Sequence, residues 1–322
     1  MDYYKMKALL INGEKLPHVG PVEWSDDLEN VADTISFTTD EQIKVGSTFA
    51  LLDGENEILK GIVSQYTQNE PNKFQYAGYD FGFYLNKNSI IKQFNGMQIS
   101  DAFKTLCRDF NIPVGSIPSM GATVKKIYKN VILADVFREF LELHRAKTGQ
   151  NYYYFTCKDG RFSVKKYELN ENLRGIVNDV AAIKSIDSIT SPSISVSMED
   201  LKNRVIVTDN GSDKISKQII ASNSGSISKY GLLQHIEQVD TDKTNNLSKV
   251  AKSKLAELNQ LTTTIDLTML GNYEMHKGVI MPVINERLSL SGDFLIKSSR
   301  HTLDGIKETV SVSLIKYDRS KL

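Results

Sequence analysis

The side chains best suited to catalysis are scattered along this 322-residue sequence and form no recognisable motif. No His-Glu-x-x-His pair occurs, although that spacing places two zinc ligands on one face of a helix. No Cys or His residues stand two to four apart, as in structural zinc sites, and no Gly-x-Ser-x-Gly turn supplies a nucleophilic serine. The Ser/Gly-rich segment at 223–226 lacks the Gly-Lys-Ser/Thr ending of a phosphate-binding loop. We therefore predict no metal and no cofactor. The five histidines are His18, His144, His235, His276 and His301.

Paired carboxylates are the remaining route to hydrolysis. Glu139 and Glu142 lie three residues apart, which puts them on one face of a predicted helix, and two such groups can serve as the acid and base of a glycosidase. On a helix that faces solvent, the same pair is ordinary surface charge. We give this second interpretation to Glu139 and Glu142 and to two other pairs, and we predict that the protein is not an enzyme. The other pairs are Asp26/Asp27 and Glu199/Asp200.

The hydroxyl-bearing residues near the C-terminus do follow a pattern, that of strands. Residues 262–270 alternate, with Ile265 and Met269 on one side and polar residues on the other, which indicates a half-buried strand. Residues 309–316 alternate in the same way. The polar sides are candidates for a water-filled lumen or a contact between subunits, with an ordinary solvent-facing surface as the alternative. Their members are Thr264, Asp266, Thr268, Thr309, Ser311 and Ser313.

A helix and several further strands must position these faces. Apolar residues between 246 and 260 recur at helical spacing and make one stripe. Strands are predicted at 279–290, 294–301 and 309–316. Asp304-Gly305, between the last two, is a hairpin turn signal. A helix that feeds antiparallel strands indicates an α+β unit built on a closed or nearly closed sheet. The stripe consists of Leu247, Val250, Ala251, Leu255 and Leu258.

The first half of the chain contains a strand-rich segment and a mixed one. Residues 1–94 hold short strands separated by turn signals such as Asn12-Gly13, a pattern typical of a barrel or sandwich. Residues 95–168 follow the order α-β-α-β-β, which indicates a compact insert. His144 continues the apolar stripe of the second helix in this insert, so we predict a histidine at the edge of the core.

Three stretches carry a resemblance to a known family. They are the aromatic segment at 79–88, the segment Met198-Glu-Asp-Leu-Lys-Asn-Arg-Val-Ile-Val207, and the region at 249–316 with its Leu-Ser-Leu-Ser-Gly strand and its Ile-Lys-Ser-Ser-Arg-His hairpin. Their order and pattern resemble the baseplate hub proteins of contractile tails in phages and R-type bacteriocins. That family includes late control protein D and the XkdQ/YqbQ-like proteins of Gram-positive prophages.

The resemblance implies an α+β, strand-dominated fold. Two tail-tube-like antiparallel β-barrels, at 1–94 and at 169–322 with the helix near 246–260, would flank a small α/β insert at 95–168. The resemblance also implies a structural hub of a contractile tail or injection particle. As a homotrimer with pseudo-sixfold symmetry, this hub would join a hexameric tail tube protein to a trimeric spike protein. Tape-measure, LysM-type and wedge baseplate proteins are further expected partners. The particle would be a virion or bacteriocin tail, assembled in the host cytoplasm and released by lysis.

The charge, the apolar runs and the cysteine count of the sequence are compatible with such a hub protein and exclude other classes of protein. Lys and Arg number 39, as do Asp and Glu. The formal net charge is therefore zero, whereas a general nucleic-acid-binding protein carries a basic excess. No apolar run approaches 18 residues, so no stable membrane insertion is expected. The two cysteines, Cys107 and Cys157, are too few for a disulfide framework. We predict that both are small buried hydrophobic residues.

Two functions of other classes stay open. A tail-associated cell-wall hydrolase would need a buried carboxylate pair or a metal cluster in the insert. A peptidoglycan-binding module could use Tyr152, Tyr153 and Tyr154. Successive residues of a strand point to opposite faces, so these three rings cannot form one platform for a sugar.

Overall fold

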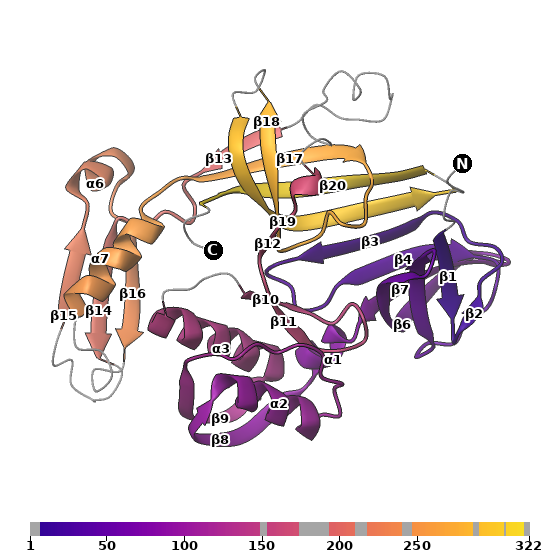
Figure 1. The fold of residues 1–322 in the computed structure, drawn as a ribbon, viewed down its shortest axis with the longest axis horizontal. Coiled ribbons are helices and arrows are strands. Elements are labelled where there is room, and N and C mark those ends of the chain that lie inside the picture. Colours follow the sequence, from indigo (N-terminus) through magenta and orange to yellow (C-terminus); the bar gives the residue numbers. More distant parts are fainter. Residues whose placement is uncertain are drawn as a thin grey trace. The chain divides into compact units, whose positions relative to one another are not determined.

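The computed structural model has an α+β fold in which strands predominate, so the predicted fold class is confirmed (Figure 1). By its internal contacts the chain forms two compact units. The first consists of Met1–Ser193 with Asp266–Leu322, and the second of Ile194–Ile265. The structure describes residues 7–148, 153–173, 193–209, 218–239, 247–285, 290–305 and 307–318.

The N-terminal strands of the first unit form an antiparallel sheet with an apolar core. Their first hairpin has the predicted turn, because Asn12 and Gly13 have φ angles of 51° and 89°, and positive φ at both positions suits a two-residue hairpin. The fourth strand buries Ile35 and Phe37 on one face and leaves Thr34, Ser36 and Thr38 half-buried on the other. These strands are β1 (Lys7–Ile11), β2 (Glu14–Lys15), β3 (Val22–Asp27), β4 (Thr34–Thr39), β5 (Thr48–Asp53), β6 (Asn56–Glu70) and β7 (Lys73–Asp80).

Four C-terminal strands, β17 (Thr262–Leu270), β18 (Val279–Asn285), β19 (Leu290–Asp304) and β20 (Lys307–Tyr317), extend the same sheet. Strand β19 pairs with β20 on one side and with β3 on the other, so His301 lies opposite both Val310 and Trp24. The strands follow the order β17-β20-β19-β3-β4-β7-β6-β5-β1-β2 (Figure 1). Segments from the two ends of the sequence therefore share one sheet.

The insert contains a two-stranded ribbon, helices and a short hairpin. The first strand of the ribbon is not predicted from its sequence pattern, because the exposed Ile91 follows the buried Ile90 and breaks the alternation of apolar and polar residues. None of the described helices is both long and apolar enough to span a bilayer. The elements are α1 (Gly82–Lys87), β8 (Ser89–Gln98), α2 (Ile99–Asp109), β9 (Thr123–Ile132), α3 (Leu133–Thr148), β10 (Tyr153–Thr156) and β11 (Ser163–Lys166).

Aromatic rings fill the core of the insert. The ring of Phe103 on α2 lies 4.9 Å from that of Phe137 on α3, nearly perpendicular to it, which is an edge-to-face arrangement that aromatic rings favour. Cys107, His144 and Cys157 are buried nearby, so the predictions for these three residues are confirmed. Burial raises the pKa of the Cys107 thiol to about 12, so this thiol is unreactive at neutral pH.

The second unit contains a three-stranded sheet covered on one face by a helix. Its central strand, β14 (Arg204–Asp209), pairs antiparallel with β15 (Gln218–Ser222) and parallel with β16 (Gln234–Val239). The predicted apolar stripe is confirmed, because it packs with Ala251 at its centre against Val205 and Val207. The helices of this unit are α6 (Ser224–Tyr230) and α7 (Leu247–Leu258), and β13 (Ser193–Ser197) precedes β14. The short elements β12 (Glu168–Leu169), which pairs with β18, and η1 (Glu171–Leu173) belong to the first unit.

Replacement of Phe103 by alanine should leave a cavity in the insert, because this ring contacts four other phenylalanine rings. We expect the free energy of unfolding to fall by about 3–5 kcal/mol, measured by urea titration of the full chain. Ile91→Ala is the control. Ile91 is 82 % exposed, so its loss should change stability by no more than about 0.5 kcal/mol. Equal losses for both variants would contradict this packing.

Candidate functional site

A polar face lies along the C-terminal strands of the large sheet. Between β17 and β20, the Thr268 Oγ1 atom lies 2.8 Å from Ser311 Oγ, and Ser313 donates a hydrogen bond to Asp266. The alternate residues of β20 are buried, so this face points away from the core. Four of the six predicted polar residues are thereby brought into contact. Thr264 belongs to the same strand β17 but falls in the second unit.

The same face continues across β19, β3 and β4. Thr309 on β20 lies opposite Thr302 on β19. One step along, Arg300 on β19 lies opposite Ser25 on β3, and the Ser25 Oγ atom lies 2.7 Å from Thr34 Oγ1 on β4. The sequence analysis recognised the alternation in β4 but could not connect it with β20, because a single sequence does not show which strands are neighbours. We call the exposed or half-buried hydroxyl residues of β17, β20, β19, β3 and β4 the polar face.

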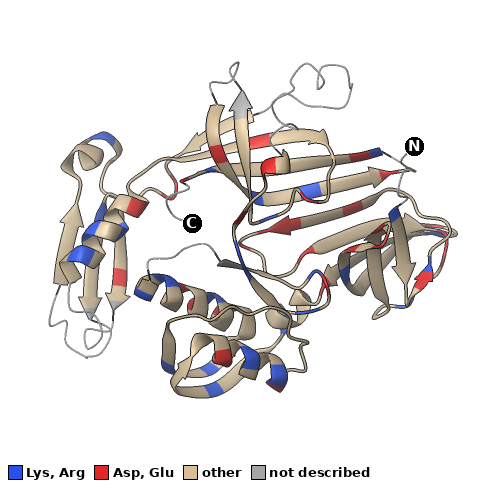
Figure 2. Cartoon of the chain, in the orientation of Figure 1, with Lys and Arg blue, Asp and Glu red and all other residues tan. Residues whose placement is uncertain are grey.

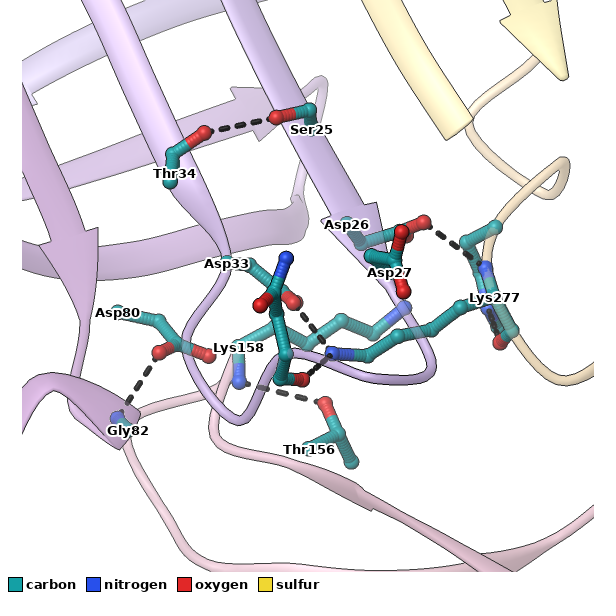
Figure 3. A network of polar contacts seen from close by, with 12 residues as sticks. Ser25, Asp26, Asp27, Asp33, Thr34, Asp80, Gly82, Thr156, Lys158 and Lys277 are labelled. Atoms are coloured by element: carbon teal, nitrogen blue, oxygen red, sulfur yellow. Dashed lines mark hydrogen bonds and ion pairs between the residues drawn. The ribbon is translucent and has the colours of Figure 1, made fainter. Parts of the chain in front are cut away.

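A buried ion pair lies where loops from both ends of the sequence meet (Figure 3). The Lys277 Nζ atom lies 2.5 Å from Asp33 Oδ1 and donates to the Asn30 carbonyl oxygen at 3.4 Å, and Lys277 is only 2 % exposed. Burial by itself lowers the pKa of Lys277, but the carboxylates of Asp33 and Asp26 outweigh this effect and raise it. The ammonium group therefore stays charged inside the protein.

Asp26 connects β3 to β19 and to the segment before β18. Its Oδ1 atom accepts hydrogen bonds from the Lys277 and Ser299 backbone nitrogens, both at 3.1 Å, and from Ser299 Oγ at 2.9 Å. Burial, together with the nearby charge of Asp33, raises the pKa of Asp26 to about 7. The interpretation of Asp26 as surface charge is therefore wrong, because residues some 250 positions later in the chain enclose its carboxyl group.

Asp80 and Lys158 complete this charged cluster. Asp80 is fully buried at the end of β7, and burial raises the pKa of its carboxyl group well above the usual value. Lys158, in the hairpin of the insert, interacts electrostatically with Asp26 and Asp33, and its carbonyl oxygen accepts from the Lys60 nitrogen at 2.7 Å. The cluster thus joins the insert to the sheet. We call Asp26, Asp33, Asp80, Lys158 and Lys277 the charged cluster. Asp33, Asp80 and Lys277 are buried, whereas Asp26 and Lys158 are half-buried.

A second polar group also connects the two ends of the chain. The His301 ring stacks on the indole of Trp24 with centroids 4.6 Å apart. The Nε2 atom of His301 lies 3.0 Å from the Met275 carbonyl oxygen, and its Nδ1 atom lies 3.0 Å from Glu308 Oε1. Lys7 on β1 donates to the other oxygen of Glu308. Strands β1, β3, β19 and β20 are therefore tied by side chains as well as by backbone pairing.

The residues considered for hydrolysis or sugar binding do not converge on a site in the described part of the insert. Both carboxylate oxygens of Glu139 lie 2.9 Å from Lys126 Nζ, as expected of surface charge, and Glu142 is exposed on the same helix. Tyr152 lies outside the described residues, and for Tyr153 and Tyr154 only the backbone is described. Basic and acidic residues occur in both units of the chain (Figure 2).

Lys277→Met should destabilise the protein strongly, because it leaves the buried Asp33 carboxylate without its counter-charge. We expect the free energy of unfolding to fall by about 3–5 kcal/mol, measured by urea titration near pH 7. The matched double variant Asp33→Asn/Lys277→Met removes both charges and should recover most of this loss. A double variant as unstable as the single one would contradict the role of this pair.

Asp26 should make stability depend on pH. Its pKa is about 7 in the folded protein and near the ordinary 3.8 in the unfolded chain, so the folded state binds the extra proton between these values. This stabilisation is present below about pH 4 and is lost as the pH rises through 7. Asp26→Asn cannot titrate, so the stability of the wild type relative to this variant should fall steadily over that range in urea titrations. A relative stability that stays level or rises would refute the assignment.

Comparison with known proteins places the chain in a family. The family model described as YqbQ-like matches residues 22–315. Two Bacillus subtilis (strain 168) relatives, the uncharacterized protein YqbQ and the phage-like element PBSX protein XkdQ, are each 25% identical over 265 residues. In both cases the match covers 81% of this chain and 78% of the relative.

Solved structures show the same fold. The 43 kDa tail protein of prophage MuSo2 from Shewanella oneidensis matches with a TM-score of 0.72 and 13% identity, over 96% of this chain and 98% of that one. A tail protein from Neisseria meningitidis MC58 matches with a TM-score of 0.69 and 16% identity, over 96% of both chains. The Escherichia coli protein c3393, a type VI secretion component described as similar to the T4 tail proteins gp27 and gp5, matches with a TM-score of 0.53 and 9% identity, over 96% of this chain and 77% of its own. The chain has the fold of phage tail proteins and belongs to the YqbQ-like family.

Proposed function

We propose that this protein is the structural hub of a phage-type tail baseplate. Three copies form a ring with pseudo-sixfold symmetry, which joins a hexameric tail tube to a trimeric spike. The observation that carries the proposal is the single sheet in which strands from both ends of the chain present one polar face. The family membership and the likeness of c3393 to gp27 and gp5 support the same function. The segments 1–94, 95–168 and 169–322 are, in this proposal, first barrel, insert and second barrel.

The chemistry of the polar face suits a lumen or a contact between subunits. Neutral hydroxyl groups dominate it, and several bond to one another across strands, as Thr268 does with Ser311 and Ser25 with Thr34. Such groups can exchange partners with water or with another chain at little cost, whereas a large apolar face would need permanent cover. Charged residues that lie among these hydroxyls include Asp266 and Arg300, which have opposite signs.

The remaining expectations belong to the same proposal. The hub acts without a cofactor or catalytic site, contacts tape-measure, LysM-type and wedge baseplate proteins, and is assembled in the bacterial host before release by lysis. It serves a contractile tail, of a phage or of a bacteriocin. A tail-associated hydrolase is the weaker alternative, because Glu139 forms an ion pair with Lys126 and Asp33 forms one with Lys277.

The purified chain should form trimers, alone or after addition of the spike protein, and native mass spectrometry measures this directly. The interface should reach the scale of obligate assemblies, roughly 2,000 Å² or more. A single bulky residue on the polar face should then prevent the chain from forming the trimer or from binding the tube protein, while the fold stays intact. Ser311→Trp is the variant, and Ser248→Trp, the same change at an exposed position of α7, is the control.

Both variants should unfold at the same urea concentration as the wild type, and only Ser311→Trp should lose assembly. A chain that stays monomeric with tube and spike proteins present would overturn the hub proposal. If Ser311→Trp assembles as well as Ser248→Trp, the polar face is an ordinary solvent-facing surface.

A further inference from the structure

The β8–β9 ribbon covers the helices of the insert with one face and exposes the other. Its inner face buries Ile90, Phe94 and Tyr128, and the Phe94 ring lies 5.6 Å from that of Phe140 on α3. Within the described chain, β8 and β9 pair only with each other, so both long edges of the ribbon are open. The outer face consists of Ser89, Ile91, Gln93 and Asn95 on β8 and of Lys125, Ile127, Lys129 and Ile132 on β9.

Three isoleucines of this outer face are exposed to solvent. Ile91 is 82 % exposed, Ile127 54 % and Ile132 43 %. The register places Ile91 opposite Lys129, so the other two isoleucines are its diagonal neighbours on β9. A single exposed isoleucine is common on protein surfaces, but three on one small face form a patch of the kind found at interaction sites.

The lysines between these isoleucines have no acidic partner in the chain as described. Lys125 and Lys129 take part in no ion pair there. By contrast, Lys92 on the same ribbon lies 2.6 Å from Asp109 Oδ2, and Lys126 lies 2.9 Å from Glu139. The outer face therefore offers apolar side chains and two unpaired ammonium groups together. Its chemistry fits an acidic surface with an apolar centre.

The zero net charge of the chain conceals a separation of charge. Residues 1–80 contain 14 Asp and Glu against 6 Lys and Arg, whereas residues 81–167 contain 6 against 14. Some of this opposition is used within one chain, since Lys158 interacts electrostatically with Asp26 and Asp33. Lys125 and Lys129 of the ribbon form no ion pair with these acidic residues in the part of the chain that the structure describes.

An acidic surface with an apolar centre is present on the N-terminal part of the sheet. The Tyr76 hydroxyl donates to the Glu41 carbonyl oxygen at 3.2 Å, and the Tyr76 ring lies 5.8 Å from that of Tyr66, so the loop after β4 and strand β6 are neighbours. Val45 in this loop is 55 % exposed and Tyr66 on β6 is 44 % exposed. Asp40 and Glu41 are exposed in the same loop as Val45, which also carries the exposed Lys44. We call Asp40, Glu41, Val45 and Tyr66 the acidic patch.

We propose that the outer face of the β8–β9 ribbon of one copy docks on the acidic patch of a second copy. This proposal rests on the proposed ring of identical subunits. The two surfaces have opposite charge and each has an apolar centre, whereas two ribbons would repel each other. The contact is therefore head-to-tail, and a head-to-tail contact can close into a ring. In the ring it adds to the main subunit contact and selects the orientation of that contact.

A structural explanation for the same residues exists and makes a different prediction. Isoleucine favours strands, and lysine on open edges prevents aggregation. If these were the only roles, reversing the charge of Lys125 and Lys129 would leave self-association unchanged. The experiment must therefore read association between copies, with folding monitored separately.

The test is a charge exchange in the full chain, with the trimer measured by sedimentation and native mass spectrometry, alone and with tube and spike proteins. Lys125→Glu/Lys129→Glu should weaken the trimer by about 100-fold, because it puts like charges together. Asp40→Lys/Glu41→Lys should weaken it similarly. A chain with all four changes should recover assembly, since every copy then presents an acidic ribbon and a basic patch. Lys147→Glu/Lys165→Glu, with the same charge change at exposed positions off the ribbon, is the control and should assemble normally.

The outcomes separate this proposal from the hub proposal. A wild type that never self-associates defeats the hub proposal. If the wild type forms a trimer and both double variants form it equally well, the docking contact alone is refuted. The same holds if the chain with all four changes does not recover assembly. A second measurement uses one chain with Ile127→Cys mixed with another with Val45→Cys, because the native cysteines are buried. A bismaleimide should join one of each, and its failure to do so within an assembled trimer would equally refute the contact.

Discussion

The buried pairing of Lys277 with Asp33 controls how the two ends of this chain meet. A buried ion pair adds little net stability compared with apolar residues of the same size, but breaking it by removing one partner is costly. Here the same lysine holds Asp26 through its backbone nitrogen, and Asp26 in turn holds Ser299 on β19. A sheet in which β19 paired in another register would leave these polar groups buried without partners. The cluster therefore determines the register in which β19 pairs, more than it adds to the free energy of unfolding.

The polar face is a consequence of that register. Side chains alternate along every strand, so a shift of one residue between β3 and β19 would turn the hydroxyls of one strand to the side where its neighbour has apolar groups. With His301 opposite Trp24, the residues Ser25 and Arg300 stand together on the outer side, next to Ser311. The core on one side of the sheet and the hydroxyl surface on the other are thus set by the same few buried contacts.

Local patterns in the sequence predict local structure here and little else. The Asn12-Gly13 turn, the stripe of α7 and the alternation of β17 and β20 depend on residues a few positions apart, and each is present in the structure. The pairing of β3 with β19 depends on residues more than 270 positions apart, and no periodicity reports it. Asp26 resembles surface charge for the same reason. Strand β8 was not predicted because Ile91 breaks its alternation, and the same residue is the most exposed large hydrophobic side chain of the ribbon.

The chain uses its polar groups in three different ways, and each use follows from their surroundings. Charges that are enclosed, such as Lys277 and Asp33, are paired and fix geometry, because an unpaired charge there would be very unfavourable. Hydroxyls on the open face of the sheet carry no charge, so they can meet water or protein without a strong preference. Charges at the surface are separated along the sequence, with acidic groups before residue 81 and basic groups in the insert. Only this third group acts over several ångströms in water. Any orientation between copies that is chosen before contact must therefore come from it, while the hydroxyl face can act only after contact is made.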